Sequence, residues 1–202
     1  MVEPLFCNTD DRSIVYRFIS DLFQVCTYFI VDDEKVIIID PGKLNENVYE
    51  WLEQFNNIEK IVYITHEHFD HHFDVNFILT YPKTFVYLHS DNFASAILDT
   101  RKNLSHYYNT PIETRCSKIS VSNYLHVLPT PGHSEMSYCF RYKNLLFGGD
   151  TVIEKKFLVL KLPGSDKAKF KESVLNLRSN IELNIVVLPG HGNIFCFDKW
   201  IV

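Results

Sequence analysis

The chain has 202 residues, 46% hydrophobic and 14% aromatic, so a single domain over residues 1–202 with a sizeable core is expected. A net charge of -5 without clustered Lys and Arg argues against a nucleic-acid partner. No stretch approaches the roughly 18 apolar residues of a membrane span, and the N-terminus lacks the pattern of a signal peptide, so no membrane partner is expected. Composition therefore predicts a cytoplasmic globular protein.

The cysteines fit the same interpretation. Five of them, at positions 7, 26, 116, 139 and 196, form no Cys-x-x-Cys pair. Their odd number favours reduced thiols over a disulfide framework, as is usual in the cytoplasm. We expect most of them to be buried and inert, and we expect Cys196 in particular to lie in the core.

Alternating strand and helix patterns run along the whole chain. In the first half, runs rich in β-branched and aromatic residues predict strands over 13–19, 24–31, 35–39, 59–64 and 84–88, with helices predicted over 45–55, 73–80 and 91–98. In the second half, strands are predicted over 124–128, 137–142, 145–147 and 185–188, with an amphipathic helix over 166–179. Segment 100–118 has no clear period and is either a lid or a plain connection. The alternation is typical of a layered sheet-and-helix sandwich.

The densest group of metal-ligating side chains directly follows the predicted strand over 59–64. Within six positions it holds His66, His68, Asp70 and His71. Because side chains alternate in an extended segment, His66 and His68 point the same way, and Asp70 and His71 follow at the turn into the next helix. Burying each group unpaired would cost on the order of a few kcal/mol, and a bound metal removes that cost. The alternative is a solvated polar loop.

Three later loops share one design, in which an apolar strand ends in small residues and one ligand-type side chain. These loops contribute His133, Asp150 and His191. Six of the seven glycines lie in short loops that also hold an Asp or a His, as expected where the backbone approaches a ligand closely. The resulting seven ligand-type groups are too many for one tetrahedral ion but suit two ions that share a bridge.

The series His66-x-His68-x-Asp70-His71, followed by His133, Asp150 and His191, resembles the metallo-β-lactamase superfamily over residues 40–192. Four motifs are similar to its glyoxalase II-like (hydroxyacylglutathione hydrolase-like) branch: Asn103-Leu-Ser, Thr130-Pro-Gly-His-Ser, Gly148-Gly-Asp-Thr and Pro189-Gly-His-Gly. The resemblance implies an α/β (α+β) fold, the four-layer αβ/βα sandwich, with the site at one edge between two sheets.

Residue by residue, the resemblance implies that one metal ion is held by His66, His68 and His133. It implies that a second ion is held by Asp70, His71 and His191. Asp150 would bridge both ions, and Asp40 would support the ligands from behind. Asp70 and Asp150 are accordingly the expected catalytic residues.

This sequence also departs from its relatives. His71 is followed by His72-Phe73-Asp74, where family members often have a glycine. The chain ends eleven residues after His191, without the C-terminal helical domain of glyoxalase II, so glutathione recognition is not implied. A zinc β-lactamase of the main subclass would carry Cys at position 150, and a flavodiiron relative would carry Glu at position 68.

The predicted cofactors are two divalent metal ions, expected to be Zn²⁺, with Fe or Mn as alternatives. With Asp70, Asp150 and one bridging hydroxide they leave a charge of about +1, which favours an anionic or strongly polarised small-molecule substrate. Metal binding lowers the pKa of water from 15.7 to about 7, so hydroxide is available as the nucleophile. A thioester or ester suits this site, because a thiolate leaves without a strong protein acid. His72, Tyr107, Tyr108 and Lys161 are general-acid candidates by residue type only.

Three other functions stay open at this stage. A mononuclear iron oxygenase resembling the persulfide dioxygenases would use His66, His133 and Asp150 alone. The same two-metal site could hydrolyse phosphodiesters. The metals could also only stabilise the fold of a non-catalytic binding module. The oligomeric state is not predicted.

Overall fold

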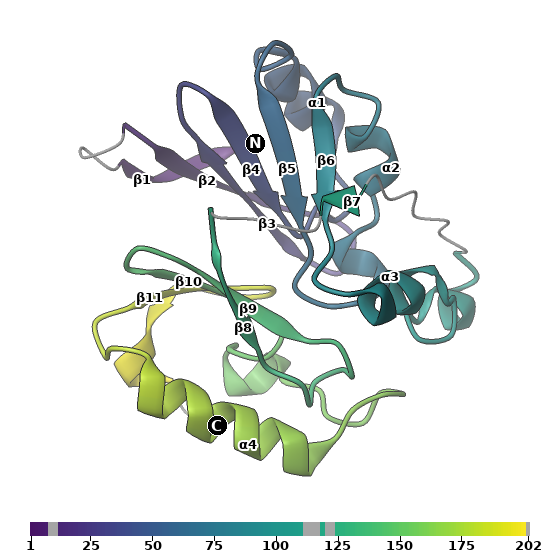
Figure 1. Cartoon of the computed structure of the whole chain (residues 1–202), viewed down its shortest axis with the longest axis vertical. Helices are drawn as coiled ribbons and strands as arrows, with labels where there is room; N and C mark the ends of the chain where they lie inside the picture. The colour runs from purple at the N-terminus through teal and green to yellow at the C-terminus, as the bar shows by residue number, and fades with distance from the viewer. Residues whose placement is uncertain (8–11, 111–117, 120–123, 201–202) are drawn as a thin grey trace.

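The structure, a computed structural model, describes residues 1–7, 12–110, 118–119 and 124–200. Two mixed β-sheets face each other (Figure 1). The first sheet runs in the order β1 to β7, antiparallel from β1 to β4 and parallel from β4 to β7. Its strands are β1 (Glu3–Cys7), β2 (Ile14–Ile19), β3 (Cys26–Val31), β4 (Lys35–Ile39), β5 (Glu59–Tyr63), β6 (Thr84–Tyr87) and β7 (Lys118–Ile119).

The second sheet has the order β12-β11-β10-β9-β8. Only β10 and β11 are parallel to each other; the other neighbours are antiparallel. Its strands are β8 (His126–Pro129), β9 (Tyr138–Tyr142), β10 (Leu145–Gly149), β11 (Val186–Pro189) and β12 (Phe195–Cys196). The parallel pair brings the ends of β10 and β11 to the same edge of the sheet.

Helices cover the outer face of each sheet (Figure 1). On the first sheet these are α1 (Glu46–Glu53), α2 (Val75–Ile78) and α3 (Asp91–Leu98), and on the second it is α4 (Lys167–Asn180). The side chains of Asn45, Ser90 and Asp166 accept hydrogen bonds from the first turns of α1, α3 and α4, which fixes where these helices begin. The buried stripe of α4 is the predicted one, Phe170, Val174 and Leu177.

The core forms three layers because the central strands are covered on both faces. In β4, Val36 and Ile38 pack against the helices, whereas Ile37 and Ile39 pack toward the second sheet. This period of two is what an extended strand requires. A third layer lies between the second sheet and α4. Helices, sheet, sheet and helix therefore make the predicted four-layer α+β fold, which is confirmed.

Several predicted elements differ in detail. Helix 73–80 is reduced to four residues in α2, and β1, β7 and β12 were not predicted. Strands and helices elsewhere begin or end within about two residues of the predicted bounds. Part of the predicted segment 100–118, residues 111–117, lies outside the described residues; its described part contains a 3-10 helix, Ser105–Tyr108. Among the described residues, no helix is both long and apolar enough to cross a bilayer.

Candidate metal centre

Strand ends from both sheets bring the seven predicted ligands together. Four of them follow β5, in a loop that includes the 3-10 helix Phe69–His71. The other three follow β8, β10 and β11 in turn. We call this group the His/Asp cluster; it consists of His66, His68, Asp70, His71, His133, Asp150 and His191. Three overlapping sets within it have ligand atoms close enough together to hold a metal ion.

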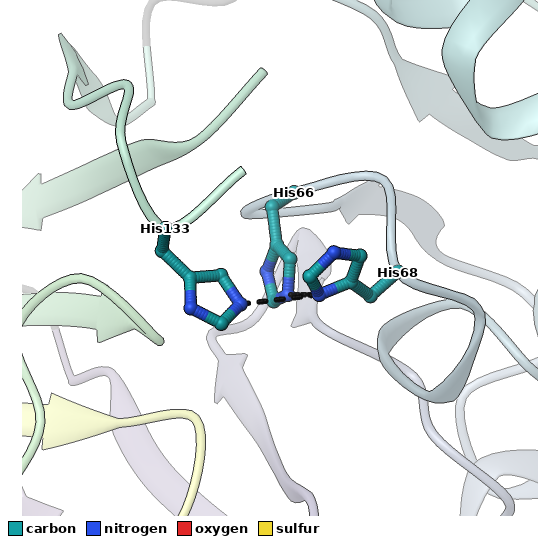
Figure 2. A group of neighbouring side chains, drawn as sticks. All are labelled: His66, His68 and His133. Atoms are coloured by element: carbon teal, nitrogen blue, oxygen red, sulfur yellow. Dashed lines mark hydrogen bonds between the residues drawn. The ribbon is translucent and has the colours of Figure 1, made fainter. Parts of the chain in front are cut away.

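Three histidines converge at one end of the cluster, and Figure 2 shows their rings pointing toward one another. The Nδ1 atom of His68 lies 3.0 Å from Nε2 of His66 and 3.1 Å from Nε2 of His133. A tetrahedral zinc ion bound at 2.0–2.1 Å would separate two nitrogen ligands by about 3.3 Å. The three nitrogens are thus already close to the spacing that one ion requires.

The remaining ligands surround Asp150 at the other end of the cluster. Asp150 Oδ1 lies 3.6 Å from His71 Nε2, and its Oδ2 lies 3.6 Å from both His133 Nε2 and His191 Nε2. Asp70 Oδ2 lies 3.7 Å from His191 Nε2 and 3.8 Å from His71 Nε2. The two oxygens of Asp150 therefore face different imidazoles, the orientation that a bridging ligand needs.

Asp40 supports this arrangement from behind. It is 2% exposed, and its carboxylate accepts three hydrogen bonds. Oδ1 accepts from the backbone N of Thr65 at 2.7 Å, and Oδ2 accepts from Thr65 Oγ1 at 2.7 Å and from His71 Nδ1 at 2.9 Å. Because Nδ1 of His71 donates to Asp40, Nε2 is the ring nitrogen that faces the cluster and that would bind a metal ion after losing its proton. The backbone of Asp40 has φ of +50°, a conformation that Asp and Asn tolerate better than most residues.

Two observations test whether the cluster fits a metal. Among the described residues, His71 Nε2 and Asp150 Oδ1 are buried and have no hydrogen-bond partner. Such orphaned atoms are costly in a protein interior unless something else binds them. They face each other at 3.6 Å, too far for a hydrogen bond and close to the separation of two ligands across one ion. The residues present therefore fit a divalent metal.

The electrostatics of the cluster lead to the same conclusion. Burial lowers the pKa of His66 and of His68 well below its usual value, aided by neighbouring imidazoles, so both are neutral, the form that binds metals. Burial would also lower the pKa of His71, but the carboxylates of Asp70, Asp150 and Asp40 outweigh it and raise the pKa to about 10. Burial likewise opposes ionisation of Asp150, yet the surrounding imidazoles lower its pKa to about 2. The site thus favours positive charge at its centre.

Glycines allow the loops to approach the cluster. A Cβ added at Gly190 would overlap Asp150 Oδ1 and lie 2.7 Å from His71 Cε1. Gly149 has φ of +48°, and a Cβ there would lie 2.6 Å from Thr65 Oγ1. The sequence-based interpretation that the glycine-containing loops meet at one site agrees with these contacts.

A pocket of about 220 Å³ opens onto the cluster. Five of its lining residues are the cluster members His68, Asp70, His133, Asp150 and His191. The other seven have apolar or aromatic side chains: Phe23, Phe69, Leu104, Tyr108, Phe157, Val159 and Leu162. We call this space the apolar pocket. Segment 100–118 thus contributes Leu104 and Tyr108 to its wall, although whether the segment acts as a lid stays a prediction.

Other candidates from the sequence lie elsewhere or act differently. His72 is fully buried, and its Nε2 bonds the carbonyl oxygen of Glu67, so it braces the ligand loop. Of the remaining general-acid candidates, only Tyr108 lines the apolar pocket; Tyr107 and Lys161 do not. Sequence reasoning missed Glu67, whose buried carboxylate accepts a hydrogen bond from Ser134. The sequence did contain a signal for Glu67, because it is a charged residue between two predicted metal ligands.

Two facing mixed sheets with a buried His/Asp cluster at their edge are the fold and the site expected of a metal-dependent hydrolase. The chain belongs to the metallo-β-lactamase superfamily, whose sequence model matches residues 20–191. This membership, expected from the ligand motifs, is confirmed.

Individual relatives are distant. The chain is 26% identical over 206 residues to a probable metallo-hydrolase of Streptococcus pyogenes serotype M6, covering 92% of this chain and 87% of that protein. It is 27% identical over 176 residues to the hydroxyacylglutathione hydrolase of Idiomarina loihiensis, covering 84% of this chain but only 58% of that protein. The crystal structure of the B3 metallo-β-lactamase BLEG-1 has a TM-score of 0.71 at 22% identity, over 98% of this chain and 95% of that one. The names differ, so the branch within the superfamily stays a prediction.

Proposed function

We propose that this chain is a dinuclear zinc hydrolase of small thioesters or esters. The observation that carries the proposal is the position of Asp150, whose two oxygens face His71 on one side and His133 and His191 on the other. A residue placed between two ligand groups supports two ions rather than one. A mononuclear iron centre using three residues would leave Asp70 and His71 in the same cluster without a role.

We assign each member of the His/Asp cluster to the ion nearest to the side chains with which it converges. His66, His68 and His133 would hold one ion, and Asp70, His71 and His191 would hold the other, with Asp150 shared. When bound, the two ions supply an activated water near neutral pH and Lewis acidity toward a carbonyl oxygen. Asp70 and Asp150 reach the pocket and are the proposed catalytic residues, since they face the position of the reacting atoms. Asp40 accepts from Nδ1 of His71 and so keeps Nε2 directed at the position of the ion.

A thioester or ester is favoured by what the pocket wall contains. Among the described lining residues, Tyr108 has the one side-chain hydroxyl, and no Lys or Arg is present. A substrate whose leaving group needs no strong acid therefore suits the site better than an amide. The name of the Idiomarina relative, a hydroxyacylglutathione hydrolase, is in line with thioester cleavage. Whether the physiological substrate is anionic stays a prediction from the charge of the loaded site.

The test measures metal content per chain on protein purified without chelator or added metal, with hydrolysis of a simple thioester assayed on the same sample. About two zinc ions per chain and activity lost with EDTA would support the proposal. One iron per chain, oxygen uptake and no thioesterase activity would refute it in favour of an oxygenase. Activity on nitrophenyl phosphodiesters but not on thioesters would select the phosphodiesterase alternative.

Two variants sharpen this test. Asp150→Asn removes the shared negative charge, so metal content should fall from about two ions to one or none, and kcat should fall at least 100-fold. Asp198→Asn is the matched control, because Asp198 is exposed and lies outside the His/Asp cluster. If Asp150→Asn kept two ions and wild-type kcat, the proposed bridging role would be wrong. If neither the wild-type protein nor Asp198→Asn hydrolysed any ester or thioester, a metal-stabilised binding module would be favoured.

A further inference from the structure

We propose that the apolar pocket is a specificity site that selects substrates with an apolar group about the size of a phenyl ring. This inference rests on the proposed function, because it concerns the part of a thioester or ester that lies beside the reacting carbonyl. The group belongs either to the acyl side or to the leaving thiol or alcohol. The chemistry of recognition is the same in both cases.

The first argument is the composition of the wall. Apart from the Tyr108 phenol, all charged or ionisable side chains among its described residues belong to the His/Asp cluster, and the rest of the lining is apolar. Polar recognition at this site is therefore confined to the metal ligands and to Tyr108. A pocket with few polar groups and a largely apolar wall is typical of a small-molecule site that binds through buried apolar area.

The second argument is an aromatic cluster in the wall of the pocket. The Phe23 ring is edge-on to both Phe69 and Tyr108, with centroid distances of 5.7 and 5.2 Å, and Phe69 and Tyr108 are 5.3 Å apart. Phe23 and Tyr108 nevertheless remain 43% and 51% exposed, and Phe157, at 38%, also lines the pocket. Several large apolar side chains left open around one pocket indicate a binding surface rather than incidental exposure.

The third argument is the backbone that presents these side chains. Phe23 and Gln24 have φ values of +56° and +58°, and Leu104 has φ of +69°. Bulky residues rarely adopt this left-handed conformation, and such strain tends to occur at functional sites. Asn103, which is fully buried, fixes the Leu104 turn: its Nδ2 donates to the Ile97 carbonyl, and its Oδ1 accepts from the Ser105 amide. Two independent loops therefore hold unfavourable conformations that place apolar side chains on the same pocket.

The size of the pocket sets the size of the ligand. A cavity of about 150 Å³ lined by apolar side chains is known to hold benzene. The apolar pocket, at about 220 Å³, has room for one ring and for a few further atoms that reach the cluster. An acetyl group would leave most of this wall in contact with water. Part of a bicyclic group would extend beyond this volume into solvent.

The test compares two substrate series on the zinc-loaded protein. In the first series the thiol is N-acetylcysteamine and the acyl group increases from acetyl through butanoyl to phenylacetyl. In the second series the acyl group is acetyl and the thiol increases from ethanethiol to benzyl mercaptan. Because each buried CH₂ is worth about 0.8 kcal/mol, kcat/KM should rise about fourfold per methylene in one series and stay level in the other. The series that rises identifies which side of the substrate occupies the pocket.

Two matched pairs of variants identify the residues. Phe23→Ala and Tyr108→Ala should reduce the ratio of kcat/KM for phenyl-sized over methyl-sized groups by about 3- to 10-fold, the scale of an aromatic contact. Phe77→Ala is the control for Phe23→Ala, since Phe77 is 41% exposed but lies outside the pocket lining. Tyr107→Ala is the control for Tyr108→Ala: Tyr107 is the preceding residue, 58% exposed, and likewise not part of the lining. Both controls should keep the wild-type ratio.

A binding measurement separates this inference from the proposed function. Benzyl alcohol, a neutral probe, should bind metal-free protein detectably by saturation-transfer NMR, whereas methanol should not, and Phe23→Ala should weaken the signal while Phe77→Ala should not. Benzyl alcohol binding without any ester hydrolysis would support the pocket and refute the proposed function. Thioester hydrolysis with flat profiles in both series, and no benzyl alcohol binding, would overturn the specificity site and leave the function standing.

Discussion

Replacing Asp40 with Asn changes one atom in a carboxylate that accepts three hydrogen bonds, two from Thr65 and one from His71. The amide can be oriented in two ways. If its NH₂ group replaces Oδ1, it faces the backbone N–H of Thr65, which can only donate, and one buried donor is lost at a cost of about 1–3 kcal/mol. If the NH₂ group replaces Oδ2, the Thr65 hydroxyl can rotate and accept, but Nδ1 of His71 must then accept as well.

The second orientation is the cheaper one, so His71 bears the change. Its proton moves to Nε2, the atom that faces Asp150 and would bind metal. We expect a 10- to 100-fold loss of affinity for the ion held by His71, about 1.4–2.7 kcal/mol, as is typical when the hydrogen-bond partner of a metal ligand is removed. The fold should persist, because Asn tolerates the positive φ of Asp40 as well as Asp does.

Zinc affinity is measured by competition with a chromophoric chelator. The protonation of the two His71 ring nitrogens in the zinc-free proteins is followed as a function of pH by long-range ¹H–¹⁵N NMR, because the pKa of His71 is raised to about 10. Asp74→Asn is a matched control: Asp74 is another partly buried carboxylate, which accepts hydrogen bonds from the Leu44 amide and the Tyr49 hydroxyl but lies outside the His/Asp cluster. It should change neither observable. Wild-type zinc affinity and unchanged protonation of the two His71 ring nitrogens in Asp40→Asn would refute the reasoning.

Three further predictions concern the glycine, the metal and the thiols. Gly190→Ala should reduce the metal content per chain, measured by elemental analysis, because the new Cβ would overlap Asp150. Full metal content would contradict the close packing of Gly190 against Asp150. Chelation should lower Tm by about 8 °C or more, since an ion at 1,000 times its Kd adds about 4 kcal/mol; an unchanged Tm would argue against a tightly bound ion. In the native protein Cys196 should react with a thiol reagent faster than Cys26 and Cys139, whose pKa values burial raises to about 11 and 12, as peptide mapping can check.

The sequence predicted the cluster better than its surroundings, for a physical reason. Each candidate ligand directly follows an apolar strand, and strand ends at one edge of packed sheets lie close together in space. Residue type, position after a strand and nearby glycines therefore all pointed to the same residues as members of the His/Asp cluster. Two of the sets that the structure brings together, His66/His68/His133 and Asp70/His71/His191, have the members expected from the family resemblance, and metal binding by these residues stays a prediction.

Local tertiary contacts explain two wrong expectations. Cys196 was expected in the core but is exposed, because it lies in β12 next to the buried Phe197 and alternation along an extended chain turns it outward. Helix 73–80 is shortened to Val75–Ile78, and the carboxylate of Asp74, at its N-cap position, binds Leu44 and Tyr49 and leaves the first turn without a side-chain cap. Propensity alone does not report which partner a polar side chain will choose.

The wall of the apolar pocket could not be predicted for a different reason. Phe23, Leu104 and Phe157 lie in connecting segments, where apolar residues have no period that assigns them to a face. Their direction depends on backbone torsions, such as the positive φ values of Phe23 and Leu104, that bulky side chains ordinarily disfavour. Sequence patterns report the regular part of a fold, whereas specificity is determined here by its irregular part.

The loops that carry the ligands are joined across the two sheets by hydrogen bonds of their own. The loop of His133 is held by Ser134, whose hydroxyl donates to the buried carboxylate of Glu67 in the first ligand loop. The loop of His191 is held by the Cys26 amide, which donates to the Gly190 carbonyl at 2.7 Å. These links do not involve the metal ligands' own binding atoms. The ligands are therefore positioned before any ion arrives, so that binding energy is not consumed in ordering the loops and remains available for holding the ions.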